Sequence, residues 1–398
     1  MDITIYPQKL SGTVSAIPSK SQAHRLLICA AFSDKPTTIF CRETNQDIEA
    51  TANCLRALGA IVERKDGSYF VVPIRKIPES AVLDCGESGS TLRFMLPIVG
   101  ALGICGTFLL SGRLPQRPLS PLWEEMERMG CCLSRPLENT LQCTGQLRNG
   151  QYTINGGVSS QFITGLLFAM ALLSGNSTLS IAGKLESKPY VDMTLQALHL
   201  FGVDTDGFHM EPQFPFRSPG NITVEGDWSN AAFFLSANFL GNDVSVTGLS
   251  IDSMQGDRAA ATWIPALKEM QVIDAADIPD LVPILAITAG ASAGAEFRNI
   301  GRLRLKESDR VQTVINMLTA LGASAHATED VLTVNPGCYH SCVIDAASDH
   351  RIAMAAAIAS TVADGPVTIL GAHCVAKSYP AFWDEFLRLG GNYEQYVR

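Results

Sequence analysis

A repeat of about 70 residues constrains the fold of this chain more than any other feature. Six times, a short polar or charged cluster precedes an apolar run that has the pattern of a buried helix. The clusters lie near residues 20, 90, 160, 229, 281 and 350, so four intervals are about 70 residues and one is about 50. A period of this length is too long for common solenoid repeats and suits a compact α/β unit.

A second series of helices follows the first by about 40 residues. These helices are amphipathic and end in glycine, the usual C-terminal stop. They lie at residues 55–59, 126–130, 198–202, 318–322 and 386–390. In the short fourth unit, residues 267–270 lack the closing glycine. Because strand-like stretches follow these helices, each unit reads as strand, buried helix, strand, exposed helix and a strand pair.

Six units in two groups of three predict an α/β fold of two similar domains, in agreement with the length of 398 residues. We expect one domain at residues 15–225 and a discontinuous one at residues 1–14 plus 226–398, joined by a hinge. The opening strand, at residues 3–7, is expected to pair with the C-terminal half, because the last unit otherwise lacks a strand.

Charge and composition narrow the class of protein. The net charge of −9 gives no reason to expect nucleic acid or an anionic membrane as a partner. The longest apolar run, at residues 352–363, is too short to span a bilayer. The eleven cysteines include no Cys-x-x-Cys pair, so we predict buried, reduced thiols and no metal site. A cytoplasmic protein is expected.

The polar starts of the buried helices are candidate anion sites, because a helix start exposes unpaired N–H groups and the positive end of the dipole. At residues 18–25, Lys20 begins the helix, and Ser21 and Arg25 lie four residues apart on one face. Two cations before a fully apolar helix indicate a site for phosphate or carboxylate. The alternative is a capping serine with solvated cations.

Other clusters carry similar chemistry, each with a structural alternative. Residues 86–93 are rich in Gly and Ser, which lets the backbone approach a ligand but also suits a plain turn. Residues 113–119 place two arginines in a proline-stiffened loop that could equally be solvated. Residues 159–161 offer two hydroxyls and an amide where capping needs only one. Residues 306–310 form the densest charged patch, ordinary for an exposed helix start, and Asp280 could be an N-cap.

Three motifs together resemble the 3-phosphoshikimate 1-carboxyvinyltransferase (EPSP synthase) family. They are Pro-Ser-Lys-Ser-x-x-x-Arg at 18–25, Leu-Lys-Glu-Ser-Asp-Arg at 305–310 and Asp-His-Arg-Ile-Ala-Met at 349–354. Residues 116–118, 159–162 and 187–190 fit the same family, and the matches run in order from residue 18 to residue 380.

The resemblance implies two similar domains, each of three βαβαββ units arranged as an inside-out α/β barrel. It implies a transferase of the shikimate pathway, which leads to chorismate and the aromatic amino acids. The enzyme moves the enolpyruvyl group of phosphoenolpyruvate to the 5-hydroxyl of shikimate 3-phosphate. No metal or organic cofactor is implied.

Carried over by position, the resemblance divides the candidate residues between the two substrates. Shikimate 3-phosphate would contact Lys20, Ser21, Arg25, Ser159, Ser160, Gln161, Ser187, Tyr190, Asp280 and Lys306. Phosphoenolpyruvate would contact Lys20, Gly89, Arg117, Gln161, Arg310, Arg351 and Lys377. The domain 15–225 would therefore carry most of the shikimate 3-phosphate site, and the other domain would carry phosphoenolpyruvate-side and acid/base residues.

Catalytic roles are expected for Asp280, Glu307 and Lys20. The attacking hydroxyl needs a base, for which Asp280 is the best placed candidate. Carbon 3 of the enol gains and later loses a proton, a role for Glu307. Lys20 would offset the charge on the departing phosphate.

Two positions depart from the family pattern, because Glu87 and Arg302 stand where asparagine is common. Glu87 either points away from the anion site or pairs with a neighbouring cation. At Gly89 the absence of a side chain leaves room beside phosphoenolpyruvate, so we expect sensitivity to the herbicide glyphosate.

Two alternatives explain part of the pattern. Enolpyruvyl transferases acting on UDP-N-acetylglucosamine usually carry a reactive cysteine in the arginine loop, and residues 113–122 contain none. A two-domain protein that only binds anions would not need the carboxylates of Asp280 and Glu307. No exposed apolar seam is predicted, so a monomer is expected.

Overall fold

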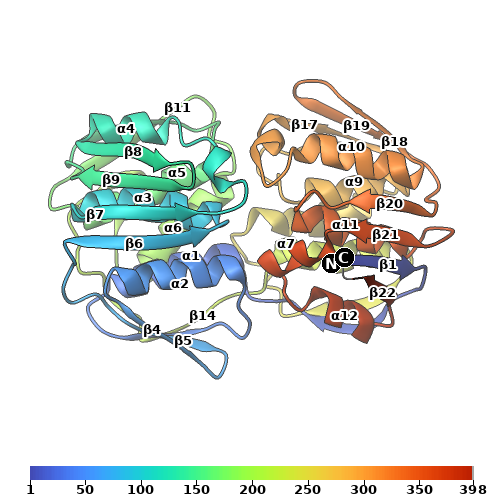
Figure 1. The fold of residues 1–398 in the computed structure, drawn as a ribbon, viewed down its shortest axis with the longest axis horizontal. Helices are drawn as coiled ribbons and strands as arrows, with labels where there is room; N and C mark the ends of the chain where they lie inside the picture. Colours follow the sequence, from blue (N-terminus) through green and yellow to red (C-terminus); the bar gives the residue numbers. More distant parts are fainter. Residues whose placement is uncertain (397–398) are drawn as a thin grey trace. The chain divides into compact units, whose positions relative to one another are not determined.

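The computed structural model describes residues 1–396 and divides into two compact units (Figure 1). Unit 1 comprises Met1–Ile17 and Gly226–Arg398, and unit 2 comprises Pro18–Glu225. The expected domains, 15–225 and 1–14 plus 226–398, share the second boundary with these units and differ from them by three residues at the first. The reason is that strand β2 (Ser11–Ser15) pairs along its whole length with β15 (Asp243–Thr247) of unit 1.

Unit 2 contains three four-stranded sheets that share one topology. In each sheet the first two strands pair in parallel, and the last two form an antiparallel hairpin. In sheet order the strands are β14 (Asn221–Thr223), β3 (Thr37–Phe40), β5 (Ser68–Val72) and β4 (Ile61–Lys65); β6 (Ser80–Gly86), β7 (Cys105–Leu110), β9 (Thr140–Gly145) and β8 (Cys131–Leu137); and β10 (Gln151–Asn155), β11 (Ser177–Ala182), β13 (His209–Met210) and β12 (Thr205–Asp206).

One buried and one amphipathic helix accompany each sheet of unit 2. The buried helices are α1 (Lys20–Ala31), α3 (Gly89–Leu102) and α5 (Ser160–Leu172), and the amphipathic ones are α2 (Gln46–Ala57), α4 (Leu122–Arg128) and α6 (Lys188–Leu200), with a short 3-10 helix η1 (Leu114–Gln116). Ser19, Ser88 and Ser159 cap the buried helices through hydrogen bonds from backbone N–H groups. These starts confirm the predicted ones. Helices α3 and α5 pack closely at Gly165, where a β-carbon would lie 2.1 Å from the Arg93 carbonyl oxygen.

Unit 1 repeats the topology in two four-stranded sheets. Their strands are β20 (Cys342–Asp345), β21 (Val367–Leu370), β1 (Asp2–Tyr6) and β22 (Asn392–Tyr396); and β16 (Gln271–Asp274), β17 (Ala295–Arg298), β19 (Val331–Asn335) and β18 (Ser324–Ala327). The helices are α7 (Trp228–Phe239), η2 (Gly256–Ala259), α8 (Ala260–Ala266), α9 (Val282–Gly290), η3 (Gly301–Leu305), α10 (Arg310–Leu321), α11 (His350–Ser360), η4 (Ala372–Lys377) and α12 (Phe382–Arg388). Strand β1 pairs with β21 and β22, which confirms that the opening strand joins the C-terminal half.

The third sheet of unit 1 contains only β2 and β15, so it lacks the antiparallel strand pair of the other sheets, which is a hairpin in four of them and the pair of β1 with β22 in the fifth. This missing hairpin accounts for the interval of about 50 residues in the repeat. At the open edge of β15, the Val244 N–H donates to Asn238 Oδ1 at 2.6 Å, and the Asn238 amide donates back to the Val244 carbonyl. The side chain thus occupies backbone groups that an edge strand would otherwise offer to another chain.

The repeated βα units in two domains confirm the predicted α/β fold class, while closure into an inside-out barrel stays a prediction. Each unit has its own apolar core. The glycines that end the five predicted amphipathic helices all have positive φ, as a helix stop requires: Gly59, Gly130, Gly202, Gly322 and Gly390.

Residues 1–396 bear on two predictions, the absence of a membrane span and the burial of the cysteines. No helix in that range is both long enough and apolar enough to cross a membrane. All eleven cysteines are free, but the prediction that they are buried is wrong for Cys105, Cys132 and Cys338, which are exposed. Cys105 and Cys132 occupy outward-facing positions of β7 and β8.

Candidate active site

The start of α1 holds Lys20 in an ion pair that the sequence did not predict. Lys20 Nζ donates to Asp47 Oδ2 at 2.9 Å, and Asp47 lies in the first turn of α2. The Asp47 carboxylate is largely buried, so the pair fixes the ammonium at the helix start. Spacing could not reveal this partner, because 27 residues separate the two.

Arg25 and Ser21 lie together, as predicted, and Arg25 is buried beneath Tyr190 of α6. Its Nη1 donates to the Ser21 carbonyl at 2.5 Å, and its Nη2 donates to the Tyr190 carbonyl at 2.7 Å. Its Nε donates to Thr194 at 2.9 Å, and the guanidinium lies over the Phe94 ring. Burial lowers the pKa of Arg25 to about 10, which leaves it charged at neutral pH. The guanidinium therefore ties α1 to α6.

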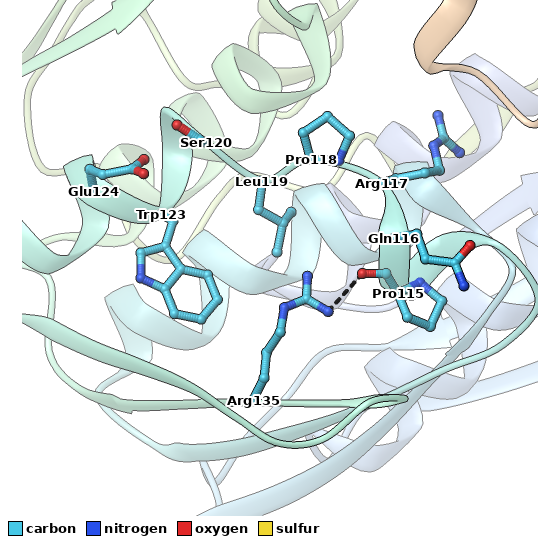
Figure 2. A pocket seen from close by; sticks show the side chains of 9 residues that line it. All are labelled: Pro115, Gln116, Arg117, Pro118, Leu119, Ser120, Trp123, Glu124 and Arg135. Atoms are coloured by element: carbon cyan, nitrogen blue, oxygen red, sulfur yellow. Dashed lines mark hydrogen bonds between the residues drawn. The ribbon is translucent and has the colours of Figure 1, made fainter. Parts of the chain in front are cut away.

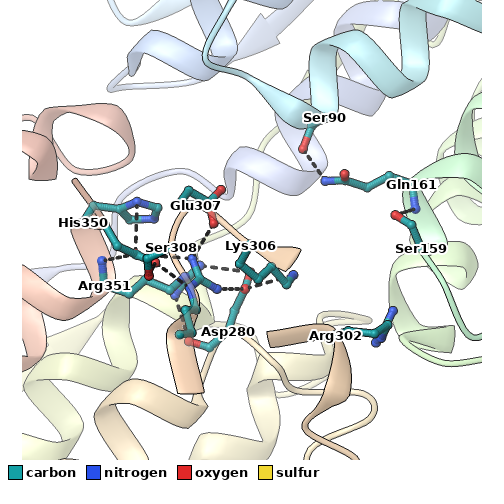
Figure 3. Close-up of polar contacts among 12 residues, drawn as sticks. Ser90, Ser159, Gln161, Asp280, Arg302, Lys306, Glu307, Ser308, His350 and Arg351 are labelled. Atoms are coloured by element: carbon teal, nitrogen blue, oxygen red, sulfur yellow. Dashed lines mark hydrogen bonds and ion pairs between the residues drawn. The ribbon is translucent and has the colours of Figure 1, made fainter. Parts of the chain in front are cut away.

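Gln161 at the start of α5 is held by residues of α3. Its Nε2 donates to Ser90 Oγ at 2.8 Å (Figure 3). Its Oε1 accepts from Arg93 Nη1 at 2.6 Å. Ser159 caps the helix, and Ser160 is buried beside it. Sequence reasoning missed Arg93. Its position four residues after Gly89, on the same helical face, was the available signal.

Gly89 is packed against two arginines. A β-carbon at this position would lie 2.6 Å from Arg117 Nη1 and 3.3 Å from Arg93 Nη1. The structure therefore brings Gly89 and Arg117 together, and only glycine allows this approach. Glu87, whose direction was open, lies against Gly112, where a β-carbon would be 2.2 Å from its carboxylate oxygen.

The loop that carries Arg117 borders a hollow of about 390 Å³ in unit 2 (Figure 2). Pro115, Leu119, Trp123 and Arg135 line it, and Arg135 Nη1 donates to the Pro115 carbonyl at 2.8 Å. The Arg117 side chain points away from Arg135. Arg135 thus anchors the loop at Pro115, which lies two residues before Arg117.

Ser187, at the start of α6, has a φ of 53°, an uncommon conformation for a residue with a side chain. Ser187 is buried and makes no capping hydrogen bond to the helix. Its carbonyl accepts from the Tyr190 N–H at 3.1 Å. Strain of this kind clusters at functional sites, so it supports the choice of Ser187 as a candidate.

Arg310 is the centre of an ion-pair cluster in unit 1. Its Nη1 lies 2.6 Å from Asp280 Oδ1, its Nη2 lies 2.8 Å from Glu307 Oε2, and its Nε lies 2.8 Å from Asp349 Oδ2. Only 1% of its side chain is exposed. Burial disfavours the charge, but Asp349, Glu307 and Asp280 outweigh burial and raise the pKa of Arg310 above its ordinary value.

Asp349 is the member of this cluster that sequence reasoning missed as a site residue. It caps α11 through the Arg351 N–H and accepts from Ser308 Oγ at 3.0 Å as well as from Arg310. Burial opposes ionisation, but Arg310 and His350 lower the pKa of this carboxyl. The ionised Asp349 carboxylate therefore fixes the orientation of the Arg310 guanidinium. The 39 residues between them hid the pairing.

Asp280 lies among three cations (Figure 3). Its carboxylate is 3.1 Å from Arg351 Nη2 and 3.4 Å from Lys306 Nζ, in addition to Arg310. Helix α9 begins only at Val282 and has no side-chain cap, so the alternative that Asp280 is an N-cap is wrong. Burial opposes ionisation, yet Arg351, Lys306 and Arg310 together hold the pKa of Asp280 well below its usual range. The side chain remains 24% exposed, so a ligand can reach it.

Lys306 completes this group. Burial lowers the pKa of Lys306 to about 8, although Asp280 favours the ammonium form. Arg302, on η3, donates to the Ala276 carbonyl at 2.7 Å and also disfavours the charge on Lys306. Lys377 lies at the end of η4 and is largely buried. The predicted residues Asp280, Lys306, Glu307, Arg310 and Arg351 thus form one cluster of alternating charges.

The fold and these residues define a two-unit α/β protein in which buried cations lie at helix starts and carboxylates stand among them. Such an arrangement suits anionic small molecules and proton transfer. A sequence model of the family "EPSP synthase (3-phosphoshikimate 1-carboxyvinyltransferase)" matches residues 5–272 and 262–386. The chain therefore belongs to the EPSP synthase family.

Curated relatives support this membership. The 3-phosphoshikimate 1-carboxyvinyltransferase of Clostridium kluyveri is 38% identical over 425 aligned positions, which cover 99% of this chain and 98% of the relative. The enzyme of the same name from Clostridium botulinum strain Alaska E43 is 36% identical, with 98% of each chain covered. The first alignment has more positions than the 398 residues of this chain, so gaps fall in this chain.

Solved structures agree in fold. An EPSP synthase from Acinetobacter baumannii superposes with a TM-score of 0.80 at 23% identity, covering 99% of this chain and all of that one. The enolpyruvyl transferase NikO from Streptomyces tendae superposes with a TM-score of 0.78 at 18% identity, covering 100% and 99%.

Proposed function

We propose that this chain is a 3-phosphoshikimate 1-carboxyvinyltransferase. It transfers the enolpyruvyl group of phosphoenolpyruvate to the 5-hydroxyl of shikimate 3-phosphate and releases phosphate. The observation that carries the mechanism is the partly exposed Asp280 carboxylate held among Lys306, Arg310 and Arg351. Such a group can accept a hydrogen bond from a hydroxyl while the cations around it attract anionic substrates.

The shikimate 3-phosphate phosphate is assigned to hydroxyls at helix starts. Ser159, Ser160 and Ser187 supply these hydroxyls, and backbone N–H groups at the start of α5 add donors. Gln161 follows Ser160 directly in α5, and Tyr190 lies three residues after Ser187 in α6. The carboxylate of the same substrate is assigned to Ser21 and Arg25. The buried position of Arg25 supports the assignment, because a guanidinium already desolvated loses little on binding an anion.

Phosphoenolpyruvate is assigned to two sets of cations. Lys20, Arg117 and Lys377 take its phosphate, and the backbone of Gly89 lies against it. Arg310 and Arg351 take its carboxylate. The carboxylates that already hold Arg310 preorganise its guanidinium, so little motion is needed during the reaction.

The reaction proceeds by addition and elimination. The 5-oxygen bonds to carbon 2 of the enol as its hydroxyl proton passes to Asp280 and carbon 3 gains a proton, which gives a tetrahedral intermediate. Carbon 3 then loses a proton as the bond from carbon 2 to the phosphate oxygen breaks. Glu307 is assigned to the proton at carbon 3, and Lys20 offsets charge on the departing phosphate.

Asp280 and Lys306 are assigned to the attacking hydroxyl. The cations around Asp280 make it a weak base, so it first orients the oxygen by accepting the hydroxyl hydrogen bond and takes the proton only as the bond to carbon 2 forms. Lys306 as an ammonium stabilises negative charge that develops on that oxygen. This division of labour predicts different pH dependences for the two residues.

A phosphate-release assay tests the function. Phosphate should appear when the chain is mixed with phosphoenolpyruvate and shikimate 3-phosphate, and not when UDP-N-acetylglucosamine replaces the latter. Release with UDP-N-acetylglucosamine alone as acceptor would reverse the assignment, and no release with either would indicate a binding protein. We further propose that the enzyme acts as a monomer in the cytoplasm.

A further inference from the structure

A chain of fully buried polar side chains connects three helices of unit 2. His24 of α1, Thr51 of α2 and Thr91 of α3 have no exposed surface. His24 Nδ1 lies 2.7 Å from Thr51 Oγ1, and Thr51 Oγ1 lies 2.7 Å from Thr91 Oγ1. Around them the core is apolar, and the His24 ring meets the Phe94 ring edge-on. Three polar groups in such a core are costly unless their hydrogen bonds are satisfied.

In this series of buried side chains, one assignment of hydrogen-bond donors and acceptors is favoured. Burial lowers the pKa of His24 to about 3, so the ring is neutral. His24 Nε2 has no hydrogen-bond partner within residues 1–396. The tautomer with its proton on Nδ1 leaves only a lone pair unsatisfied, which costs less than a buried N–H. His24 therefore donates to Thr51, and Thr51 donates to Thr91.

Beyond Thr91 the series of hydrogen bonds reaches the starts of two helices. Thr91 Oγ1 lies 2.8 Å from Ser88 Oγ, the cap of α3, and 3.4 Å from the Asp47 carbonyl in the first turn of α2. The Asp47 carboxylate in turn holds Lys20 at the start of α1. Gly89 follows Ser88 directly and begins α3. The hydrogen bonds thus link the helix starts that carry Lys20 and Gly89.

We propose that His24, Thr51 and Thr91 are positioning residues, which set Lys20 and Gly89 at the spacing that phosphoenolpyruvate requires. Apolar side chains of the same size would pack equally well but would let the helix starts slide, whereas directional hydrogen bonds specify one arrangement. The inference rests on the proposed roles of Lys20 and Gly89. It adds residues that touch no substrate.

The central residue provides the sharpest test. Thr51→Val removes both hydrogen bonds and keeps the shape, whereas Thr51→Ser keeps the hydroxyl. We expect Thr51→Val to raise the KM for phosphoenolpyruvate by about 5- to 30-fold, since small displacements of binding groups are costly. The KM for shikimate 3-phosphate should change less than about twofold, and Thr51→Ser should restore normal values.

A matched control separates positioning from stability. Thr288 is equally buried, but its hydroxyl only donates to the Ile284 carbonyl of its own helix, α9. Thr288→Val should leave both KM values unchanged. Thermal unfolding of each variant reports stability. If Thr51→Val lowers the melting temperature but leaves both KM values unchanged, or raises both equally, the positioning role is refuted.

Two further variants keep the outcome decisive. If Thr51→Val does not fold, Thr91→Val tests the same series one residue further on, because it removes the hydroxyl that contacts Thr51, Ser88 and the Asp47 carbonyl, and it should raise the KM for phosphoenolpyruvate alone. An unchanged KM in that variant would overturn the proposal. Lys20→Met separates the proposed role of Lys20 in binding from the proposed positioning role of His24, Thr51 and Thr91. An unchanged KM there rejects the role of Lys20, whereas a raised KM there with a normal one in Thr51→Val rejects only the positioning role.

Discussion

Replacing Gly89 with alanine tests how closely Arg117 must approach the start of α3. A β-carbon at Gly89 would lie 2.6 Å from Arg117 Nη1 and 3.1 Å from its Cζ, whereas ordinary contact begins at 3.4 Å. The guanidinium must therefore retreat by about 0.8 Å, the difference between 2.6 Å and 3.4 Å. The atom displaced belongs to the end of a flexible side chain, so we expect a stability loss below about 1 kcal/mol.

Binding should suffer more than stability. A charged hydrogen bond contributes about 1.5–3 kcal/mol, so its partial loss should raise the KM for phosphoenolpyruvate roughly 10-fold. Inhibition by glyphosate should weaken as well, because the methyl group fills the space beside the substrate. Steady-state kinetics with varied phosphoenolpyruvate, with and without glyphosate, measure both effects.

The control is Gly301→Ala, whose β-carbon would meet only Asp330 Oδ1, at 3.7 Å. That variant should bind both substrates normally. Unchanged inhibition and an unchanged KM in Gly89→Ala would refute the reasoning, because Arg117 would then tolerate a displacement that the structure makes unavoidable.

Three further predictions follow from the pKa shifts and ion pairs. Asp280→Ala should lower kcat roughly 10²–10⁴-fold and leave shikimate 3-phosphate binding, measured by calorimetry, largely intact; near-normal turnover would reject the role of Asp280. Because burial lowers the pKa of Lys306 to about 8, kcat/KM should fall as pH rises through 8, and Lys306→Arg should move this fall to higher pH. If kcat/KM instead rises as pH increases through 8, neutral Lys306 acts as the base. Burial holds the pKa of His24 at about 3 although Asp47 favours its charged form. The unfolded chain therefore binds the extra proton between pH 6.5 and 3, and unfolding free energy should fall with decreasing pH by up to about 1.4 kcal/mol per unit, less steeply in His24→Asn. Equal slopes in urea titrations would contradict a buried neutral ring.

Local pattern predicted much of the fold because the forces involved act over a few residues. Serine and aspartate before an apolar run satisfy N–H groups within three positions, so the starts at Ser19, Ser88 and Ser159 could be read directly. Glycine at the end of an amphipathic run likewise depends on local backbone geometry. The interval of about 50 residues falls at the unit whose sheet lacks its hairpin, although the sequence pattern did not predict that absence.

Asp280 shows where local reasoning stopped. Its place before an apolar run is typical of a cap, yet the carboxylate turns to Arg310, Arg351 and Lys306, which lie 26 to 71 residues further along the chain. Asp47 and Asp349 were missed for the same reason, because each pairs with a cation at least 27 residues away. The ionisation of Asp349 depends on burial and on Arg310 together.

The repeat, the two-domain α/β class, the helix starts and the family could be predicted from the amino-acid sequence, because these depend on spacing and on short motifs. The tertiary structure alone decided the partner of each charge and which carboxylates stay ionised. It also decided which polar groups lie in the core. A buried charge is stabilised by whatever group folding brings within about 3 Å of it, and separation along the chain does not specify that neighbour.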